Sequence, residues 1–480
     1  MIGSRTALGL KATVMVLEMF LLTWLIFTEE LRPVAFLLLI IVGAIAIVVV
    51  VGRDWPNGAL LVILIASAMP RFAATIGTVH VRPEHVAVAL VSLASISLFK
   101  KHRILLATKM QVFDHLLIGF VALNFVSSAF ASPEPRMTLR WAALNAIAVS
   151  PYFFIRFVLR DEQRIFKAFQ TLLWLGAAES TYGVACFLSN RLFHTQVGID
   201  TEQYGGFVPG IYGTQYEPNI FGSYTACCAI MFFAFYMIDR ESRRTCYAFG
   251  FAICLLASVI SMARSVMLAL PVAALVVIFS VYKSPQIQWR RLIPITLVIG
   301  FLLFTFSPLM LDFISERFST IDLSELSADS TALNRIVQTA VAIQDIRAHP
   351  ILGTGTSSFQ LTFSWDDYGL PGMKGDNREG GWISNTPIRV LHDTGLVGFA
   401  ALMGFLVSIG MTTRKALRVA NHRNKAVIVA LCAGLVLYVI TFQATEATLL
   451  AFTWIHLGLL ACTGSTMRSR EGVLLTSVVN

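Results

Sequence analysis

The chain has 480 residues; 56% of them are hydrophobic, only 14% are charged, and the formal net charge is +9. A soluble domain is about 45–50% apolar and about 25% charged, so one globular core cannot bury this surplus, and a soluble protein is excluded. The basic residues lie in short clusters between apolar runs, a pattern that sets membrane orientation and argues against nucleic acid as a partner.

The apolar residues fall into about fourteen runs, most of them close to the roughly 20 residues that a helix needs to cross a bilayer. The sequence therefore predicts an all-α integral membrane protein, a polytopic helical bundle of about 12–14 spans. In chain order the predicted spans are 13–28, 34–52, 57–70, 86–99, 115–131, 138–158, 166–189, 218–238, 246–262, 266–282, 292–308, 387–411, 427–446 and 449–464.

The basic clusters predict the orientation of these spans. With an even number of spans and a cytoplasmic N-terminus, every cluster falls on the cytoplasmic side, as the positive-inside bias requires. We therefore expect a multi-pass protein with both termini in the cytoplasm. The clusters lie within residues 100–103, 160–167, 240–244, 283–291, 414–423 and 468–470.

Two long segments then face outward, at 190–217 and at 309–386. Loops of the second length usually have their own structure and a function. The predicted organisation is N-terminal membrane helices over 1–308, an extracytoplasmic loop domain over 309–386, and C-terminal membrane helices with a short cytoplasmic tail over 387–480.

An amphipathic helix is predicted over 331–349, inside the longer outer segment. Asp329 or Ser330 can cap its start, and Pro350 ends it. The polar stretch 364–381 that follows is rich in Gly and Asp and predicts a lid or an ordered loop. The apolar stripe of the helix comprises Leu333, Ile336, Val337, Ala340 and Val341.

Two arginines are candidates for binding an anion. Arg264 lies in a short link between two predicted spans, at their outer end, where the positive-inside bias does not place it. The alternatives are a snorkelling arginine and an anion clamp, since a guanidinium matches phosphate oxygens in bidentate geometry. Arg335 lies on the polar side of the predicted loop helix. Alone it is a solvated surface residue. If that helix packs its apolar stripe on the membrane bundle, Arg335 would point into the same cavity as Arg264.

Other polar residues mark the outer face and the spans. Glu217 and Asn219 lie at the head of the predicted span 218–238, where Asn219 could cap the helix or bind substrate. Glu179 and Glu446 lie within predicted spans and are expensive to bury. They are predicted to be paired or neutral structural groups, with a proton or ion pathway as the alternative.

Several classes of site are excluded by the sequence. The seven cysteines form no CxxC motif and no Cys/His cluster, so neither a disulfide framework nor a zinc site is predicted. There is also no Walker motif, no GxGxxG, no HExxH and no GxSxG, which excludes ATP-driven pumping in cis, dinucleotide chemistry and the familiar hydrolase sites.

Four stretches occur in a characteristic order. SMARSVML carries Arg264 in a turn between spans, and TALNRIVQTAVAIQDIRAHPILGTGTSSF carries Arg335 on the loop helix before a Gly-x-Gly turn. NTPIRVLHDTGLVGF then opens the re-entering span with an Asp-Thr-Gly signature, and YEPNIFGSY is a weaker fourth motif. Over roughly 205–410 the chain resembles the O-antigen ligase and polymerase superfamily, bacterial membrane glycosyltransferases that act on lipid-linked sugars.

The resemblance implies a GT-C-like fold in the bacterial cytoplasmic (inner) membrane, with the active face outside. The donor would be a glycan on undecaprenyl diphosphate, and the acceptor lipid A-core, another lipid-linked repeat unit or a further envelope acceptor. No metal or other cofactor is implied. Arg264 and Arg335 match the two essential arginines of the family and would hold the diphosphate, while the loop 364–386 covers the acceptor.

One position departs from the family. A histidine usually precedes the Asn at the head of the re-entering helix, but here Ser384 precedes Asn385, and a serine is a poor base near neutral pH. His392, two helical turns further on, is the catalytic candidate in its place. The substrate-binding candidates are Arg264, Arg335, Asn219, Glu217, Ser384, Asn385 and Trp382, and the other candidate bases are Asp376, Asp393, Glu217 and His349.

The missing histidine favours a polymerase or exopolysaccharide role over a ligase. Two other classes remain open. A secondary transporter would suit the many spans, with Glu179 and Glu446 inside them, although no inverted repeat is detected. A non-catalytic polysaccharide-assembly protein, acting with other such membrane proteins, would bind a lipid-linked glycan without turning it over.

Overall fold

The computed structural model of the chain describes residues 60–68, 74–76, 79–81, 87, 110–200, 210–238, 244–282, 330–364 and 381–479. The predicted spans 13–28, 34–52, 86–99 and 292–308 lie outside the described residues, apart from residue 87. Of the predicted span 57–70, residues 60–67 are helical.

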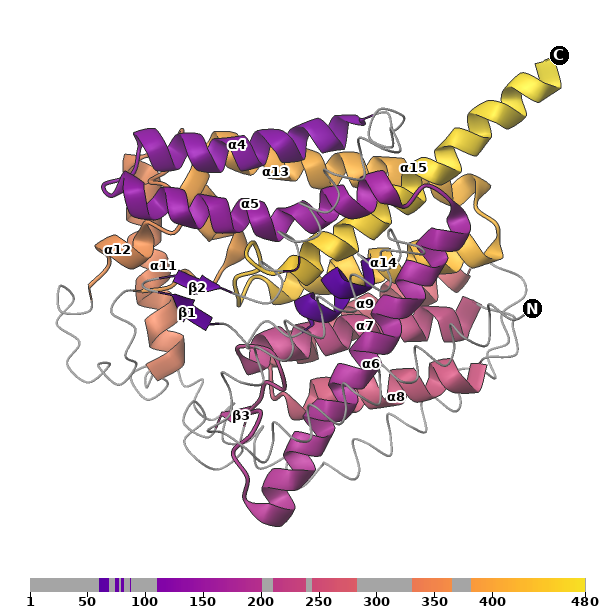
Figure 1. Cartoon of the computed structure of the whole chain (residues 1–480), viewed down its shortest axis with the longest axis horizontal. Coiled ribbons are helices and arrows are strands. Elements are labelled where there is room, and N and C mark those ends of the chain that lie inside the picture. The colour runs from indigo at the N-terminus through magenta and orange to yellow at the C-terminus, as the bar shows by residue number, and fades with distance from the viewer. Residues whose placement is uncertain are drawn as a thin grey trace.

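Helices dominate the described part of the chain (Figure 1). They are α4 (Val112–Phe130), α5 (Pro135–Val158), α6 (Glu162–Phe193), α7 (Pro218–Ile238), α8 (Arg244–Ile260), α9 (Arg264–Tyr282), α11 (Ser330–Ala348), α12 (Phe359–Thr362), α13 (Thr386–Val419), α14 (His422–Thr441) and α15 (Ala451–Val479). Two small antiparallel pairs accompany them, β1 (Ala74–Ile76) with β2 (Val79–Val81), and β3 (Ile199–Asp200) with β4 (Gly210–Ile211).

The bundle is that of an integral membrane protein, which confirms the predicted fold class. Among the described residues, 6 helices are long and apolar enough to cross a membrane: α4, α5, α7, α9, α13 and α14. The helix α6 has 32 residues against the predicted span 166–189. At 1.5 Å per residue it is about 48 Å long, more than the roughly 30 Å of hydrocarbon requires, and it runs obliquely across the bundle (Figure 1).

The centre of the bundle is α7, which packs against α8, α9 and α14, while α4 lies along α13 and α5 along α15. Small residues allow this close packing. A Cβ added at Gly176 of α6 would come within 2.2 Å of the Cys228 sulfur on α7, and one added at Gly222 of α7 within 2.4 Å of the Ser261 hydroxyl. Such close backbone approach is typical of helices packed in membranes.

The helix α13 is broken at Gly395, whose backbone has φ 63° and ψ −168°. The turn 350–358 fits into this break through main-chain hydrogen bonds. The Thr354 N–H donates to the His392 carbonyl at 2.9 Å, and the Leu396 N–H donates to the Pro350 carbonyl at 2.8 Å. The turn 350–358 therefore folds into the bundle beside α4 and α13.

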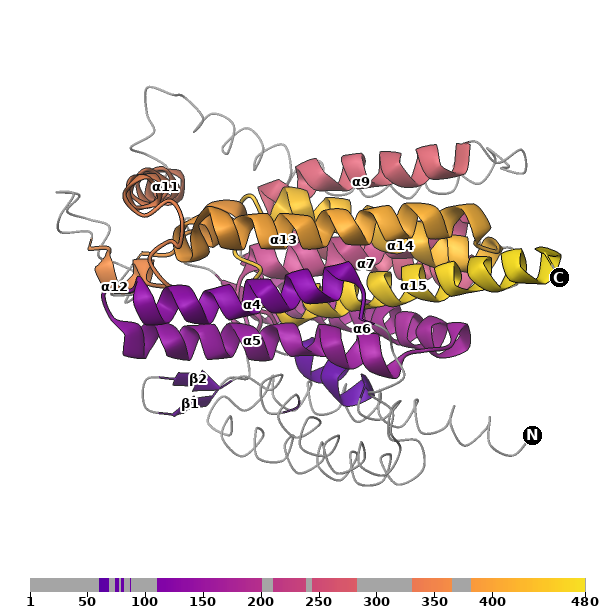
Figure 2. The ribbon, with the colours of Figure 1, turned by 90° about the horizontal axis from the view of Figure 1, so that it is seen from above.

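The helix α11 lies across the end of the bundle, roughly perpendicular to α13; it runs vertically in Figure 1 and is seen end-on in Figure 2. We call this the α11 end. The predicted helix 331–349 is thus confirmed, but the prediction of the residues that form its apolar stripe is partly wrong. Val337 and Val341 pack on a buried cluster with Ala342, whereas Ile336 is 51% exposed and Ala340 is also exposed.

The packing on α13 explains this difference. The face of α11 that meets α13 also carries Gln338 and Asp345, so the docking face is more polar than a purely apolar stripe predicts. Its apolar contacts are Phe359, Phe363 and Ile383, with Ile388 beside them.

A buried polar cluster ties α4 to α5 near the opposite end of the bundle. The Tyr152 hydroxyl donates to an Asp114 carboxylate oxygen at 2.8 Å, and the Arg156 Nε lies 3.4 Å from the same oxygen. Glu179, predicted to be a paired or neutral structural group, is buried, and its carboxylate accepts the Thr214 N–H at 2.9 Å.

Candidate active site

The start of α13 is fixed by Asn385. Its side-chain oxygen accepts the Ile388 N–H at 3.0 Å as the helix cap, and its side-chain nitrogen donates to the Gln443 carbonyl at 2.9 Å. These bonds orient the first turns of α13 against the connection between α14 and α15. Asn385 is thus engaged as a helix cap. Ser384 is half-buried beside it, and its hydroxyl lies 3.5 Å from the Trp382 carbonyl.

Arg389, one turn into α13, is the charged centre of the site and is only 3% exposed. Its Nε lies 3.4 Å from an Asp393 oxygen, and its Nη1 lies 3.2 Å from a Glu446 oxygen, an ion pair without hydrogen-bond alignment. Its Nη2 donates to the Ser357 hydroxyl at 2.6 Å. Loss of one partner from a buried pair of this kind typically costs about 3–5 kcal/mol, so the three charges depend on one another.

Glu446 belongs to the connection after α14, because that helix ends at Thr441 and not at 446 as predicted. The predicted pairing of this carboxylate is confirmed: it accepts from the Thr448 hydroxyl and the Leu449 N–H, and it faces Arg389. These contacts hold the connection against the start of α13.

Asp393 joins the two halves of the site. One of its oxygens accepts the Ser357 N–H at 2.9 Å, and its carbonyl accepts the Ser127 hydroxyl at 2.6 Å. Ser357 has φ 59°, a left-handed backbone that is uncommon for a residue other than glycine. Such strained positions are maintained by their surroundings and concentrate at functional sites.

His392 is buried, with 1% exposure, between two carboxylates. Its Nδ1 lies 3.0 Å from Asp393, and its Nε2 lies 3.2 Å from Asp345 of α11. Both nitrogens can donate only in the imidazolium form. In this arrangement His392 has no free nitrogen to accept a proton from a substrate, and it connects α11 to α13.

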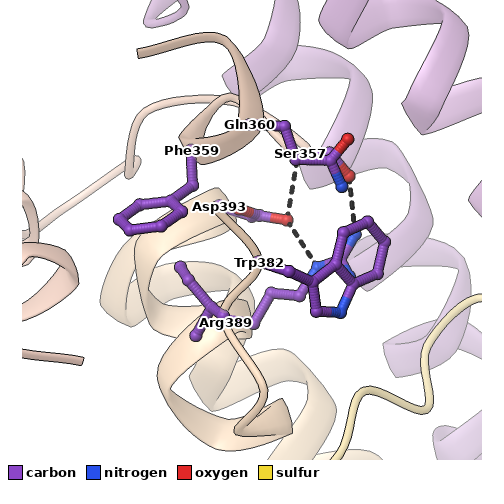
Figure 3. Close-up of a pocket in the computed structure, with 7 residues that line it drawn as sticks. Ser357, Phe359, Gln360, Trp382, Arg389 and Asp393 are labelled. Carbon is purple, nitrogen blue, oxygen red and sulfur yellow. Dashed lines mark hydrogen bonds and ion pairs between the residues drawn. The ribbon is translucent and has the colours of Figure 1, made fainter. Parts of the chain in front are cut away.

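A pocket opens above Arg389 (Figure 3). Its free volume is about 10 Å³, room for about one water molecule. The Trp382 ring lies over the Arg389 guanidinium, with 4.3 Å between the ring centroid and Cζ. The Trp382 and Trp141 rings meet edge to face at 6.4 Å. The lining residues are Ser357, Phe359, Gln360, Trp382, Ile383, Arg389 and Asp393.

Arg264 is half-buried as the first residue of α9. The turn before it is tight: Met262 has φ 57°, and a Cβ added at Gly222 of α7 would lie 3.1 Å from the Ala263 Cβ. This contact places the turn beside the beginning of α7, where Glu217 and Asn219 lie. The start of α9 is at the α11 end of the bundle in both Figure 1 and Figure 2.

Of the two alternatives for Asn219, a helix cap or substrate binding, the structure excludes the cap, because α7 already begins at Pro218. The Glu217 carbonyl accepts the Ile220 and Phe221 N–H groups at 3.1 and 3.0 Å, and proline suits the first turn because its missing N–H is not needed there. Glu217 and Asn219 are both half-buried.

The predicted residues therefore form two groups at the same end of the bundle. Trp382, Ser384, Asn385 and His392 surround the start of α13, whereas Arg264, Glu217 and Asn219 lie where α7 meets α9. Arg335 is half-buried on α11, the helix that crosses this end.

Sequence reasoning missed Arg389, although a signal was present. An arginine within the predicted span 387–411 is a functional candidate by default, and its spacing of four residues from Asp393 predicts an ion pair on one helix face. Ser357 gave no such signal, because its role depends on a left-handed backbone. Asp376, named as a candidate base, lies outside the described residues.

The arrangement combines arginines at one end of the bundle with a pocket that has the Asp393 carboxylate on its wall. Within the described ranges, no group of three or more His, Cys, Asp or Glu side chains is placed to hold a metal ion.

Comparison with known proteins identifies one part of the chain. The O-antigen ligase family model matches residues 249–403, and no curated protein matches the chain. The matched region includes Arg264, Arg335 and every residue that lines the pocket. It leaves out Glu217, Asn219 and Glu446.

Proposed function

Because the O-antigen ligase family model matches residues 249–403, we propose that the chain is a membrane glycosyltransferase that transfers or polymerises a glycan carried on undecaprenyl diphosphate. The proposal places this reaction at the α11 end, on the outer face of the cytoplasmic membrane. The single observation that carries it is the family match over 249–403, which contains Arg264, Arg335 and the pocket.

The leaving group of this reaction is a diphosphate. An acceptor hydroxyl attacks C1 of the glycan, the bond from C1 to the diphosphate oxygen breaks, and negative charge develops on the diphosphate. In the proposal Arg264 and Arg335 bind that charge, since preorganised cations aimed at developing charge are usually the largest contribution to catalysis. Their guanidinium groups also fit phosphate oxygens in bidentate geometry.

The proton of the acceptor hydroxyl needs a base in the pocket. Asp393 lines the pocket, while His392 lies behind it with both ring nitrogens facing carboxylates. In the proposal Asp393 accepts the proton, and His392, predicted as catalytic, orients the Asp393 carboxylate. Trp382 and Ser384 border the acceptor, and a polymerase or exopolysaccharide role is favoured because Ser384 stands where a ligase histidine is expected.

Complementation of the deletion strain in the native host tests this proposal. Arg264→Ala and Arg335→Ala are expected to abolish long-chain glycan at wild-type membrane levels, and Arg264→Lys to restore little, because lysine lacks the planar fork. Arg347→Ala is the matched control, since Arg347 is an exposed arginine of the same helix α11, and it should complement fully. Full restoration by both alanine variants would contradict the mechanism and favour a transporter.

The same deletion strain separates the two reactions of the family. A polymerase is indicated if long chains disappear altogether. A ligase is indicated if long chains persist on the lipid carrier and are no longer attached to their final acceptor.

A further inference from the structure

The helix α11 has two faces that compete for docking on the bundle, and they overlap along one edge. The first is the predicted apolar stripe, whose residues are Leu333, Ile336, Val337, Ala340 and Val341. The second is the face that docks, whose residues are Val337, Gln338, Val341, Ala342 and Asp345. Successive residues are about 100° apart on a helix, so the centres of the two faces differ by about one residue position.

Apolar burial alone favours the stripe. In the observed docking Ile336 is 51% exposed and Ala340 is also exposed, while Gln338 and Asp345 occupy positions on the docked face. Removal of apolar surface from water is the main favourable contribution to packing, so a purely apolar contact would rotate α11 until Ile336 turned inward. A polar contact is therefore needed to select the observed face.

The pair between Asp345 and His392 supplies that polar contact. The His392 Nε2 lies 3.2 Å from an Asp345 oxygen, and its Nδ1 lies 3.0 Å from an Asp393 oxygen. The His392 ring is only 1% exposed and meets the Phe359 ring edge to face at 5.4 Å, so it is fixed on the bundle side. Because a hydrogen bond is directional and apolar contact is not, this pair fixes the rotation of α11 about its own axis.

We infer that His392 and Asp345 are positioning residues, which set the rotation of α11 and thereby turn Arg335 toward the bundle. The inference rests on the proposed role of Arg335 in binding the diphosphate. Arg335 lies about 90° round the helix from the centre of the docked face, but about 170° from the centre of the apolar stripe. In the observed docking Arg335 is half-buried. Docking on the stripe would turn it away from the bundle, which α11 crosses at one end (Figure 2).

Cysteine labelling of the full chain in nanodiscs measures this rotation without requiring turnover. Ala340→Cys reports the exposed face of α11 and Gln338→Cys the docked face, because a maleimide reacts with accessible thiols. Mass spectrometry reads both on the tryptic peptide 336–347, which holds no native cysteine. Position 340 should be labelled much faster than position 338, and Asp345→Asn should lower the ratio of the two rates about tenfold. Gln344→Ala, at an exposed neighbouring position, should leave the ratio unchanged.

A second substitution separates rotation from simple loosening. Ile336→Gln removes apolar surface from the competing stripe, so its addition to Asp345→Asn should restore most of the labelling ratio. If α11 only loosens, Ile336→Gln restores nothing. Ile336→Gln alone should behave as wild type, because the Ile336 side chain is exposed.

Two labelling results would overturn the inference. An unchanged ratio in both Asp345→Asn and His392→Gln means that the apolar cluster alone sets the rotation. A ratio that falls in Asp345→Asn and is not restored by Ile336→Gln means that the pair holds α11 without selecting a face. Since His392→Gln alters the same contact from α13, it decides the question if Asp345→Asn fails to fold.

Transfer kinetics connect the rotation to Arg335. Asp345→Asn should lower kcat/KM for the donor about tenfold and leave the KM for the acceptor unchanged, and added Ile336→Gln should restore most of the activity. A loss confined to the acceptor KM would overturn the positioning of Arg335. If the labelling ratio responds as expected while the donor kinetics stay unchanged, the rotation stands and the proposed role of Arg335 fails.

Discussion

At the scale of single residues, two glycines decide how the site is assembled. A Cβ added at Gly395 would lie 2.2 Å from the Ile351 carbonyl oxygen, and one added at Gly353 would lie 2.4 Å from the His392 carbonyl oxygen. Both neighbours are main-chain atoms that cannot rotate away. Both glycines also have a left-handed φ, 63° and 71°, so a side chain is excluded twice over.

Gly395→Ala is expected to lower the free energy of unfolding by roughly 2–4 kcal/mol, since it adds backbone strain to a contact that cannot relax. Unfolding in nanodiscs, with membrane yield as a second measure, would show this as a clear loss of stability. Gly410→Ala on the same helix is the matched control, because nothing lies within 4 Å of its added Cβ. A Gly395→Ala variant as stable as Gly410→Ala would mean that the break in α13 is not required.

The charged residues show how far sequence reasoning reaches at this scale. A buried ionisable group is visible in the sequence as an interruption of an apolar run, and on that ground Glu179 and Glu446 are predicted to be paired or neutral. The identity of the partner is not visible. Glu446 meets Arg389 across 57 positions of the chain (446 − 389), and Glu179 meets a backbone N–H, which no side-chain pattern encodes.

At the scale of secondary structure, the docking of α11 on α13 determines where Arg335 lies. Of the described elements, α11 makes its main contact with α13. The apolar part of this contact is the cluster around Ala342, and the polar part is the Asp345–His392 pair at 3.2 Å. Since Asp345 is 37% exposed and His392 is 1% exposed, the pair closes the interface at its edge.

Asp345→Asn is expected to loosen α11 while the bundle stays folded. A hydrogen bond to a charged group contributes about 1.5–3 kcal/mol when buried, and less here because Asp345 is partly exposed, so protection of α11 amides against hydrogen exchange should fall roughly tenfold. Gln344→Ala, at the exposed neighbouring position, is the control. Unchanged exchange in Asp345→Asn would show that the apolar cluster alone holds the helix.

The sequence predicted this helix to within a residue at each end, 331–349 against Ser330–Ala348. Its orientation was only partly predictable, because Ile336 and Ala340 continue an apolar pattern on the side that α13 does not contact. Helical periodicity shows which positions are apolar. Which face of the helix docks depends on the surface of the partner helix. Here that surface includes His392, which selects the face with Asp345.

At the scale of the whole molecule, the two ends of the bundle differ in kind. The α11 end carries the broken helix, the pocket and both candidate arginines. The opposite end carries basic residues at the end of α13 and at the start of α14, including Arg418 and Arg423. The positive-inside bias predicts that this opposite end faces the cytoplasm.

Cysteine labelling with a membrane-impermeant maleimide tests that orientation. Cys246 at the start of α8 is an exposed thiol, whereas Cys227, Cys228 and Cys254 are buried and should be inert. Cys246 should be labelled in inverted vesicles and not in intact spheroplasts, and Gln344→Cys on α11 should show the reverse. Cys246→Ser is the blank. Labelling of Cys246 from outside would reverse the topology.

The ends of a span are predictable where one helix corresponds to one apolar run. The predicted span 218–238, for example, has the same first and last residues as α7. The ends are less predictable where a helix continues past its apolar run: α13 reaches Val419 against a predicted 411. Hydropathy reports the residues that face lipid, and it carries no signal for the turn 350–358 that enters the bundle between α4 and α13.

The main-chain contact between that turn and Gly395 also has a consequence for evolution. Contacts between glycines and main-chain carbonyl oxygens do not depend on the identity of the side chains around them. Side chains around the site can then change without rebuilding the main-chain frame. The geometry of the site can thereby be conserved while its chemistry changes.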